Sequence, residues 1–426
     1  MNETLSESFK KSIKNGTGEA ILLLKENPSA NFDQYILKAC THNLAYDPQC
    51  EGSRAEYLFE ILSLARNKEK IVNEIIRQLN SPNKEYWDIQ LLFDLAAIIA
   101  KQGNQEAKKA IYQRYSNNLN PEFEFADTNV LVALDGLNGL KFVAETQGRK
   151  IELDHDYWVD DRQLQVCKEY FPESSPKNYL AQKAQSNKYI NVYLTKIEEI
   201  ESLRTENATI RGKRSLSQLL KLIDEGKRIP IIAGKWLTDE EVVSVAKLLL
   251  HEKDEKKIEA YLRLLLRAKY PLDISNLLPL LITDNKQIKH SILRILSKIK
   301  DNQIRELIDK NYTDLTYLND HLEFFVSNFF EKDLKVLSRI LDTLDDDDEI
   351  HYFGMIIKDI FDGNSIKHPR NLLVKLYSAT NCSICRESFI KILISANQIS
   401  DKILRELRYD CERDIRQLAN EYTQKC

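Results

Sequence analysis

Glycine and proline are scarce in this chain. Its 426 residues include only 12 Gly and 10 Pro, well below the usual frequencies of about 7% and 5%. Sheet-rich enzymes need glycine in their turns, and nucleotide-binding folds need Gly-rich loops, whereas an array of helices needs neither. The shortage therefore favours a protein that consists of helices and short connections.

Several motifs of enzymes and membrane proteins are also missing. The sequence contains neither GxGxxG, GxxxxGK[ST] nor GxSxG, so it lacks a phosphate-binding glycine loop and the nucleophile elbow of hydrolases. No apolar run approaches the length of about 18 residues that spans a membrane, and Met1–Lys14 has no apolar signal-peptide core. We therefore expect a cytoplasmic protein without a cofactor and without membrane contact, and no enzymatic activity is indicated.

The seven cysteines are odd in number and irregular in spacing, which is typical of free thiols in a reducing compartment. Cys382 and Cys385 form a CxxC motif at the expected start of a helix, where the helix terminus favours thiolate. The pair is either a redox or metal site, with Cys411 and Cys426 as further zinc ligands, or part of the helical core. We favour the core, because no second CxxC and no close pair of histidines accompanies the motif.

A repeat of about 30 to 35 residues runs through the second half of the chain. Each repeat has an Asp or Asn, which suits a helix N-cap, followed by apolar residues spaced as on one helical face. The predicted caps are Asp254, Asp284, Asp314, Asp346, Asn381 and Asp410. Each cap opens the second helix of a pair, whose first helices are expected at Val242–Leu250, Ile274–Ile282, Ile304–Lys310, Leu334–Leu344, Leu372–Ala379 and Ile403–Leu407.

This pattern resembles the HEAT and armadillo-like repeat family over residues 238–426. The resemblance lies in the polar cap and in a basic residue directly after the first core position, namely Lys289, Arg386 and Arg416. The first repeat departs from the pattern, because Glu259 stands at that place. The resemblance implies a right-handed α-solenoid, a ladder of acidic and basic side chains between repeats, and a concave face lined by the second helices.

The first half of the chain is expected to be helical but irregular, with helices broken at positions such as Asn27-Pro28 and Ser81-Pro82. Residues 189–211 predict one long helix. We predict an N-terminal helical domain at 1–225, a linker at 226–237 and a HEAT-like array at 238–426. The linker is suggested by its glycines and proline in the run Gly226–Gly234.

Two functions fit an all-helical array without a catalytic motif. The first is a protein-binding scaffold, adaptor or inhibitor that uses the solenoid surface. The alternative is a nucleic-acid-binding protein, similar to HEAT-like DNA alkylation-repair glycosylases, with a basic concave face. The net charge of −4 argues against a wholly basic surface but leaves room for a basic stripe. Its candidate residues, for a partner or for phosphate, are Lys256, Lys257, Arg263, Arg267, Lys286, Lys289, Arg294 and Lys298.

Overall fold

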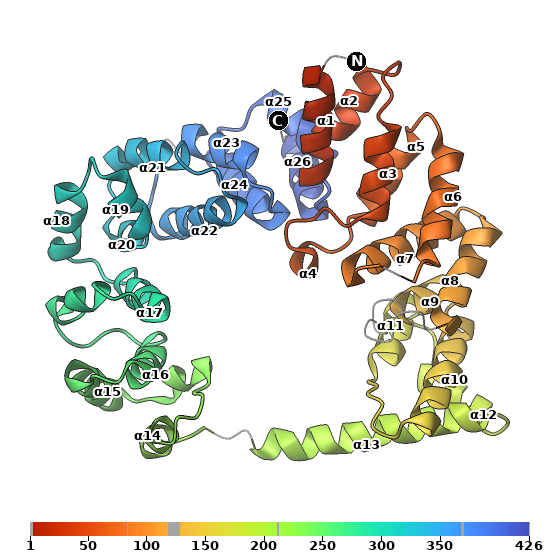
Figure 1. Ribbon diagram of the computed structural model, residues 1–426, viewed down its shortest axis with the longest axis horizontal. Helices are drawn as coiled ribbons and strands as arrows, with labels where there is room; N and C mark the ends of the chain where they lie inside the picture. Colours follow the sequence, from red (N-terminus) through yellow and green to blue (C-terminus); the bar gives the residue numbers. More distant parts are fainter. Residues whose placement is uncertain (1–2, 83, 118–127, 211–212, 368–369, 426) are drawn as a thin grey trace. The chain divides into compact units, whose positions relative to one another are not determined.

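The computed structural model describes residues 3–82, 84–117, 128–210, 213–367 and 370–425 (Figure 1). Every regular element in these ranges is an α-helix or a short 3₁₀ helix, and none is a strand, which confirms the predicted all-α class. None of these helices has both the length and the apolar composition that are needed to cross a bilayer. Cys426 lies outside the described residues.

The chain divides into two compact units. Unit 1 comprises residues 1–210, 381–387 and 400–426, and unit 2 comprises residues 211–380 and 388–399. The predicted linker 226–237 lies within unit 2, where residues Ile231–Trp236 form the 3₁₀ helix η2 against helix α16 (Glu255–Leu265). Separate folding of the predicted domains 1–225 and 238–426 stays a prediction.

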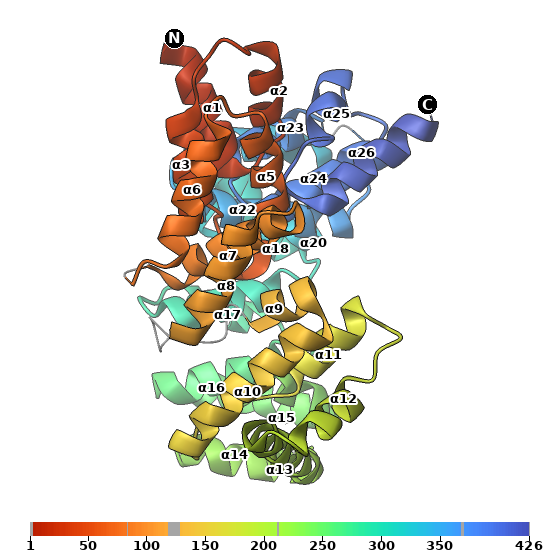
Figure 2. The same cartoon turned by 90° about the vertical axis from the view of Figure 1, so that its right-hand side faces the viewer.

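Unit 1 begins with successive helices whose apolar residues form one core. Helices α5 to α8 pack on one another, and α10 packs along α9 and α13 (Figure 2). The predicted long helix is confirmed as α13. The bounds of the unit 1 helices are α1 Glu3–Asn15, α2 Glu19–Glu26, α3 Asp33–Thr41, α4 Pro48–Glu51, α5 Ala55–Ser63, α6 Lys68–Leu79, α7 Tyr86–Lys101, α8 Gln105–Asn117, α9 Thr128–Asp135, α10 Leu137–Leu153, α11 Arg162–Tyr170, α12 Pro176–Ala184 and α13 Lys188–Ile210.

The C-terminal segment of unit 1 packs against its first helices. Helices α25 (Asp401–Leu407) and α26 (Arg413–Lys425) lie beside α2 and α5 (Figure 1). The amide of Cys411 donates to the carbonyl of Gly16 at 2.8 Å, and Arg405 forms an ion pair with Glu26 at 2.8 Å. The two ends of the chain therefore share one packed core, which also contains Cys411 at its edge.

Glycine permits this close approach. A Cβ atom at Gly18 would lie 1.9 Å from the carbonyl oxygen of Glu406, far inside van der Waals contact. The backbone of Gly18 itself has φ −64°, which any residue adopts, so the contact alone requires glycine at this position.

Unit 2 consists largely of helix pairs that contact their neighbours. Helix α16 packs between α15 and α17, α20 packs on α18 and α22, and α21 packs on α23. The elements of unit 2 are α14 Leu216–Asp224, η2, α15 Asp239–His251, α16, η3 Ile274–Asn276, η4 Leu278–Leu281, α17 Lys286–Leu296, α18 Asn302–Lys310, α19 Leu315–Asp320, α20 Phe324–Asn328, η5 Glu331–Asp333, α21 Leu334–Leu341, α22 Asp347–Gly363, α23 Arg370–Ala379 and the second part of α24 (Ser383–Ser395).

Three of the six predicted helix caps are confirmed, and the helix predicted after Asn381 begins at Ser383. Asp254, Asp314 and Asp346 are N-caps whose side chains accept from amides of the first turn, as their short carboxylates allow. The cap of α17 is Asn285 rather than the predicted Asp284.

Two predictions were wrong in detail. The first helix predicted at Ile274–Ile282 is instead the pair of 3₁₀ helices η3 and η4, because Pro279 lacks an amide donor and disfavours the α conformation at Leu278. Asp410 does not cap the last helix, which begins at Arg413. Its buried carboxylate binds Arg386 at 3.3 Å and accepts from the amide of Glu412, which lies directly before this helix.

Candidate functional site

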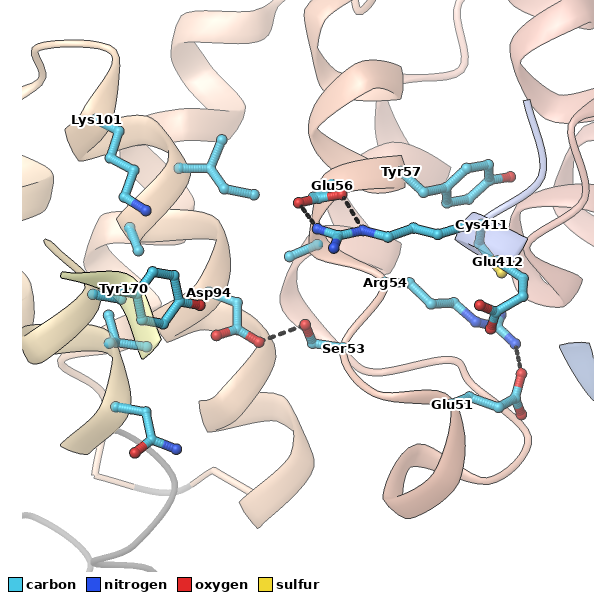
Figure 3. A pocket seen from close by; sticks show the side chains of 17 residues that line it. Glu51, Ser53, Arg54, Glu56, Tyr57, Asp94, Lys101, Tyr170, Cys411 and Glu412 are labelled. Atoms are coloured by element: carbon cyan, nitrogen blue, oxygen red, sulfur yellow. Dashed lines mark hydrogen bonds and ion pairs between the residues drawn. The ribbon is translucent and has the colours of Figure 1, made fainter. Parts of the chain in front are cut away.

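A pocket of about 400 Å³ opens on the surface of unit 1 (Figure 3). Its walls come from the segment between α4 and α5, from α7, α9 and the end of α11, and from the start of α26. Small and aliphatic side chains form its apolar part, and charged side chains surround them. The apolar lining residues are Ala55, Ala97, Ile98, Val130 and Ala133. This volume and this mixed lining are typical of binding sites in proteins.

Asp94 is the central acidic group of the pocket. It extends from α7 toward the opposite wall, where the hydroxyl of Ser53 donates to its Oδ2 at 2.5 Å (Figure 3). Burial raises the pKa of the Asp94 carboxyl, and the hydrogen bond from Ser53 offsets only part of that rise. In the part of the chain that the structure describes, no Lys, Arg or His side chain forms an ion pair with Asp94.

Two ion pairs fix the wall opposite α7. Arg413 at the start of α26 donates its Nε to Glu56 of α5 at 2.9 Å, and both side chains are exposed at the rim. Arg54 binds Glu51, and both of these side chains are buried. Burial alone would raise the pKa of Glu51, but Arg54 and the hydrogen bonds to this carboxylate hold the pKa below its ordinary value. These paired charges shape the pocket, whereas Asp94 is left without a counter-charge.

Arg54 has an unusual backbone. Its φ of 54° lies in the left-handed region, which non-glycine residues rarely adopt. Its guanidinium also donates to the carbonyl of Lys14 at 2.8 Å, and its buried Nε has no hydrogen-bond partner among the described residues. Strained residues of this kind concentrate at functional sites, which supports the choice of this pocket.

Two residues directly before α26 have side-chain pKa values that their surroundings raise. Burial raises the pKa of Glu412, and the nearby acidic residues Glu387, Asp414 and Asp410 raise it further. Burial raises the pKa of the Cys411 thiol to about 11, so this thiol is protonated at neutral pH. On the opposite side, the exposed ring of Tyr170 lies 5.9 Å from the Lys101 ammonium (Figure 3).

The eight basic residues predicted as candidates all lie in unit 2, and none of them lines the pocket. Four are engaged locally, and one of them is Lys298, which donates to the carbonyl of Leu266. Lys257 binds Asp224 at 2.7 Å, Lys289 lies 3.8 Å from Asp320, and Arg263 donates to the carbonyl of Ile229 at 3.2 Å. Lys256, Lys286, Arg267, Arg294 and Lys298 are exposed. Their role in binding stays a prediction.

The CxxC motif lies in unit 1. Cys382 and Cys385 are both buried, and the amide of Ser383 between them donates to Glu51 at 3.0 Å. A hydrogen bond with Cys382, together with burial, raises the pKa of the Cys385 thiol. A protonated, buried thiol is a poor nucleophile, which favours the core interpretation of the pair. The metal-binding alternative stays a prediction.

Sequence reasoning missed Asp94, Ser53 and Glu412 as site residues. One signal was available, because Asp94 interrupts an otherwise apolar stretch between Phe93 and Leu95, both fully buried. An acidic residue inside such a stretch needs a specific reason. Its partner Ser53 is distant in sequence, so the pairing could not be read from local pattern.

Comparison of the chain with models of protein families, with curated proteins and with solved structures found no match. The geometry and chemistry of the site therefore carry the functional interpretation.

Proposed function

We propose that the chain is a non-enzymatic protein-binding scaffold, built as a HEAT-like α-solenoid, whose unit 1 pocket holds a basic side chain of a partner protein. The unpaired Asp94 carboxylate carries this proposal. A half-buried carboxylate loses hydration, and a single hydroxyl donor such as Ser53 replaces little of it. An ammonium or guanidinium from a partner would supply the missing positive charge.

The remainder of the pocket suits a peptide segment. Its apolar lining can accept the methylene stem of lysine or arginine, since these side chains bury their stems and keep the charge on polar groups. Glu412 adds a second carboxylate whose pKa is raised by burial, and binding of a cation would stabilise the ionised form of both acids. The exposed Tyr170 ring offers a flat contact surface at the rim.

The side chains of the pocket favour binding over catalysis. No histidine is among its lining residues, and the Ser53 hydroxyl donates to a carboxylate rather than to an imidazole. The Cys411 thiol is protonated at neutral pH because its pKa is about 11. The described lining thus lacks the histidine that most often activates a serine or cysteine nucleophile.

The HEAT-like architecture is supported by the stacked helix pairs of unit 2. One contact also agrees with the ladder that the resemblance implies. Arg386, at the predicted basic position, binds Asp410 of the following repeat. Repeat arrays of this kind present extended surfaces to partners, so a pocket for one anchoring side chain fits the same class of function.

The test uses an array of eight-residue peptides with a central lysine, arginine, glutamate or alanine, probed with the purified full-length protein. We expect selective binding of peptides with central Lys or Arg. For the best peptide, Asp94→Asn should weaken the affinity about 30-fold, since loss of one partner of a buried charge pair costs about 2 kcal/mol. Glu106→Gln removes the same charge from an exposed position on α8 and should change the affinity less than twofold.

An affinity of Asp94→Asn equal to that of the wild type would refute the role of Asp94. Equal binding of peptides with central Glu and central Lys would refute a basic ligand altogether. The proposal of a protein partner fails if no peptide of the array binds and the protein instead retains nucleic acid on purification.

A further inference from the structure

A second candidate site lies in unit 2, where Arg267, Arg294 and Lys298 lie at the C-terminal ends of α16 and α17. These helices pack side by side (Figure 1). Lys298 lies just beyond the end of α17. Its Nζ donates to the carbonyl of Leu266, and Leu266 is the C-cap residue of α16. The Lys298 ammonium is therefore next to the backbone of Arg267, which follows Leu266 in the chain. Arg294 lies in the last turn of α17, four residues before Lys298.

Both arginines act electrostatically on Lys298. Burial lowers the pKa of Lys298, and the positive charges of Arg294 and Arg267 lower it further. Like charges at such separations repel and are normally dispersed or neutralised. Neighbouring cations on the same two helices are neutralised in this way, since Lys257 binds Asp224 and Lys289 lies near Asp320.

No comparable partner is found for the cluster among the residues that the structure describes. Neither Arg267, Arg294 nor Lys298 has a carboxylate oxygen within 4.0 Å. Asp359 of α22 interacts with Arg294 electrostatically, but the two do not form an ion pair. The bond to Leu266 explains Lys298 as a cation at a helix C-terminus. Arg294 also lies in the last turn of a helix, but neither arginine forms an ion pair with a described carboxylate.

We propose that Arg267, Arg294 and Lys298 form a phosphate-binding site. A phosphate group carries up to two negative charges and several acceptor oxygens, so it can neutralise more than one cation at once. The planar guanidinium groups of two arginines match phosphate oxygens in a bidentate manner, and the lysine adds a point charge. A single carboxylate would leave a surplus of positive charge. This site is separate from the unit 1 pocket and does not depend on the function proposed for it.

The same phosphate chemistry occurs in a nucleic-acid backbone and in small phosphorylated molecules. Two probes distinguish these sources: a fluorescein-labelled 12-nucleotide oligothymidine, followed by anisotropy, and inorganic pyrophosphate, followed by calorimetry. Both are titrated into the full-length protein at low and moderate salt. The variant Arg267→Gln/Arg294→Gln removes two charges without changing the contact of Lys298 with Leu266. Arg339→Gln removes one exposed charge from α21 in the same unit and serves as the control.

We expect at least one probe to bind the wild type and to bind the double variant at least tenfold more weakly. The control should stay within twofold of the wild type. If the oligonucleotide binds, a plot of the logarithm of its binding constant against the logarithm of the salt concentration should be shallower for the double variant. The slope should differ by about 1.4, because two fewer phosphates are neutralised. Binding of pyrophosphate alone would assign the site to a small phosphorylated ligand, and binding of the oligonucleotide alone would assign it to a nucleic-acid backbone.

Three results would overturn the proposal. The first is the absence of binding of both probes to the wild type at low salt. The second is an undiminished affinity of the double variant, whose unchanged circular dichroism would show that it is folded. The third is equal or tighter binding of a polyglutamate peptide of the same net charge as the oligonucleotide, since this would show that the cluster recognises carboxylates.

Discussion

The pKa values of two carboxylates in unit 1 are shifted in opposite directions. Glu51 has a buried cationic partner, and its pKa falls. Asp94 has only the Ser53 hydroxyl, and its pKa rises because burial disfavours the charged form. The difference lies in the neighbour rather than in the residue type. A buried acid without a cationic partner, such as Asp94, destabilises the unbound protein. Such a residue persists most readily where it serves binding.

The free-energy cost of burying the Asp94 charge makes the stability of the protein depend on pH. Because its pKa is raised in the folded state, the folded protein holds this proton more tightly than the unfolded chain. Stability is therefore full below the ordinary pKa of aspartate and falls as the pH rises through that value toward the folded-state pKa. Asp94→Asn removes the carboxylate charge and with it this loss of stability, and the amide oxygen of asparagine can still accept from Ser53.

We expect Asp94→Asn to raise the melting temperature at pH 7 by about 2 °C, with a difference close to zero below about pH 3.5. Thermal unfolding followed by circular dichroism over this pH range measures the effect. Glu106→Gln should show no such pH-dependent gain. A lower melting temperature of Asp94→Asn at pH 7 would mean that the carboxylate is stabilised by contacts other than the one with Ser53.

The cysteines also differ in their exposure to solvent. The Cys50 thiol is exposed, whereas Cys382 and Cys385 are buried, and the pKa of Cys385 is raised. We expect iodoacetamide at pH 8 to modify Cys50 in the native protein well before either residue of the CxxC pair, by tenfold or more in rate. Peptide mass spectrometry over time measures these rates. Faster modification of Cys385 than of Cys50 would restore the redox interpretation.

At the scale of elements, single caps decide where helices begin. Asp346 accepts from the amides of Asp348 and Glu349 at 2.9 and 3.1 Å and so opens α22. Asp346→Ala should destabilise unit 2 by about 1 kcal/mol. Asp345→Ala, which removes an adjacent exposed acid without a capping role, should leave stability nearly unchanged. Denaturant unfolding of both variants measures the difference, and equal effects would show that charge rather than capping is responsible.

The close contact between α2 and α25 requires glycine at position 18. Because its Cβ would collide with the backbone of Glu406, Gly18→Ala must separate α2 from α25. We expect a loss of about 2 kcal/mol in the stability of unit 1, in the range of other overpacked cores. Gly363→Ala, whose Cβ would have an ordinary contact at 3.5 Å, is the control. Similar stabilities of the two variants in denaturant would show that the α2–α25 contact is absent in solution.

At the scale of the whole molecule, the C-terminal helices belong with the first ones. Residues 400–426 share a unit with residues 1–210 rather than with the helix pairs that precede them in sequence. Local unfolding follows such compact units. We therefore expect amides in α25 and α26 to exchange with hydrogen–deuterium kinetics similar to those of α2 and α5. Gly18→Ala should accelerate exchange in all four helices and leave α15–α17 unaffected.

Exchange mass spectrometry of the full chain tests this assignment against the domain boundary predicted from the sequence. Under the predicted division, α25 and α26 would respond together with α15–α17, as parts of one array from residue 238 to 426. Acceleration restricted to α2 and α5 would likewise contradict the shared unit.

Local sequence determined most helices of this protein. Helix starts at Asp254, Asp314 and Asp346 follow from cap chemistry, and the apolar faces follow from 3.6-residue periodicity, because both depend on residues a few positions apart. The 3₁₀ helices near Pro279 are an exception in which one ring overrode an apolar pattern.

Tertiary structure alone decided the sites. The bond between Ser53 and Asp94 joins residues 41 positions apart, and the pair of Arg413 and Glu56 joins residues 357 positions apart. Periodicity holds no information on such pairings, because they depend on which helix faces meet after the chain has folded. The sequence also showed the cations of α16 and α17 without showing which would be neutralised. Asp224 and Asp320 reach Lys257 and Lys289, and only their positions in space leave Arg267, Arg294 and Lys298 as a cluster.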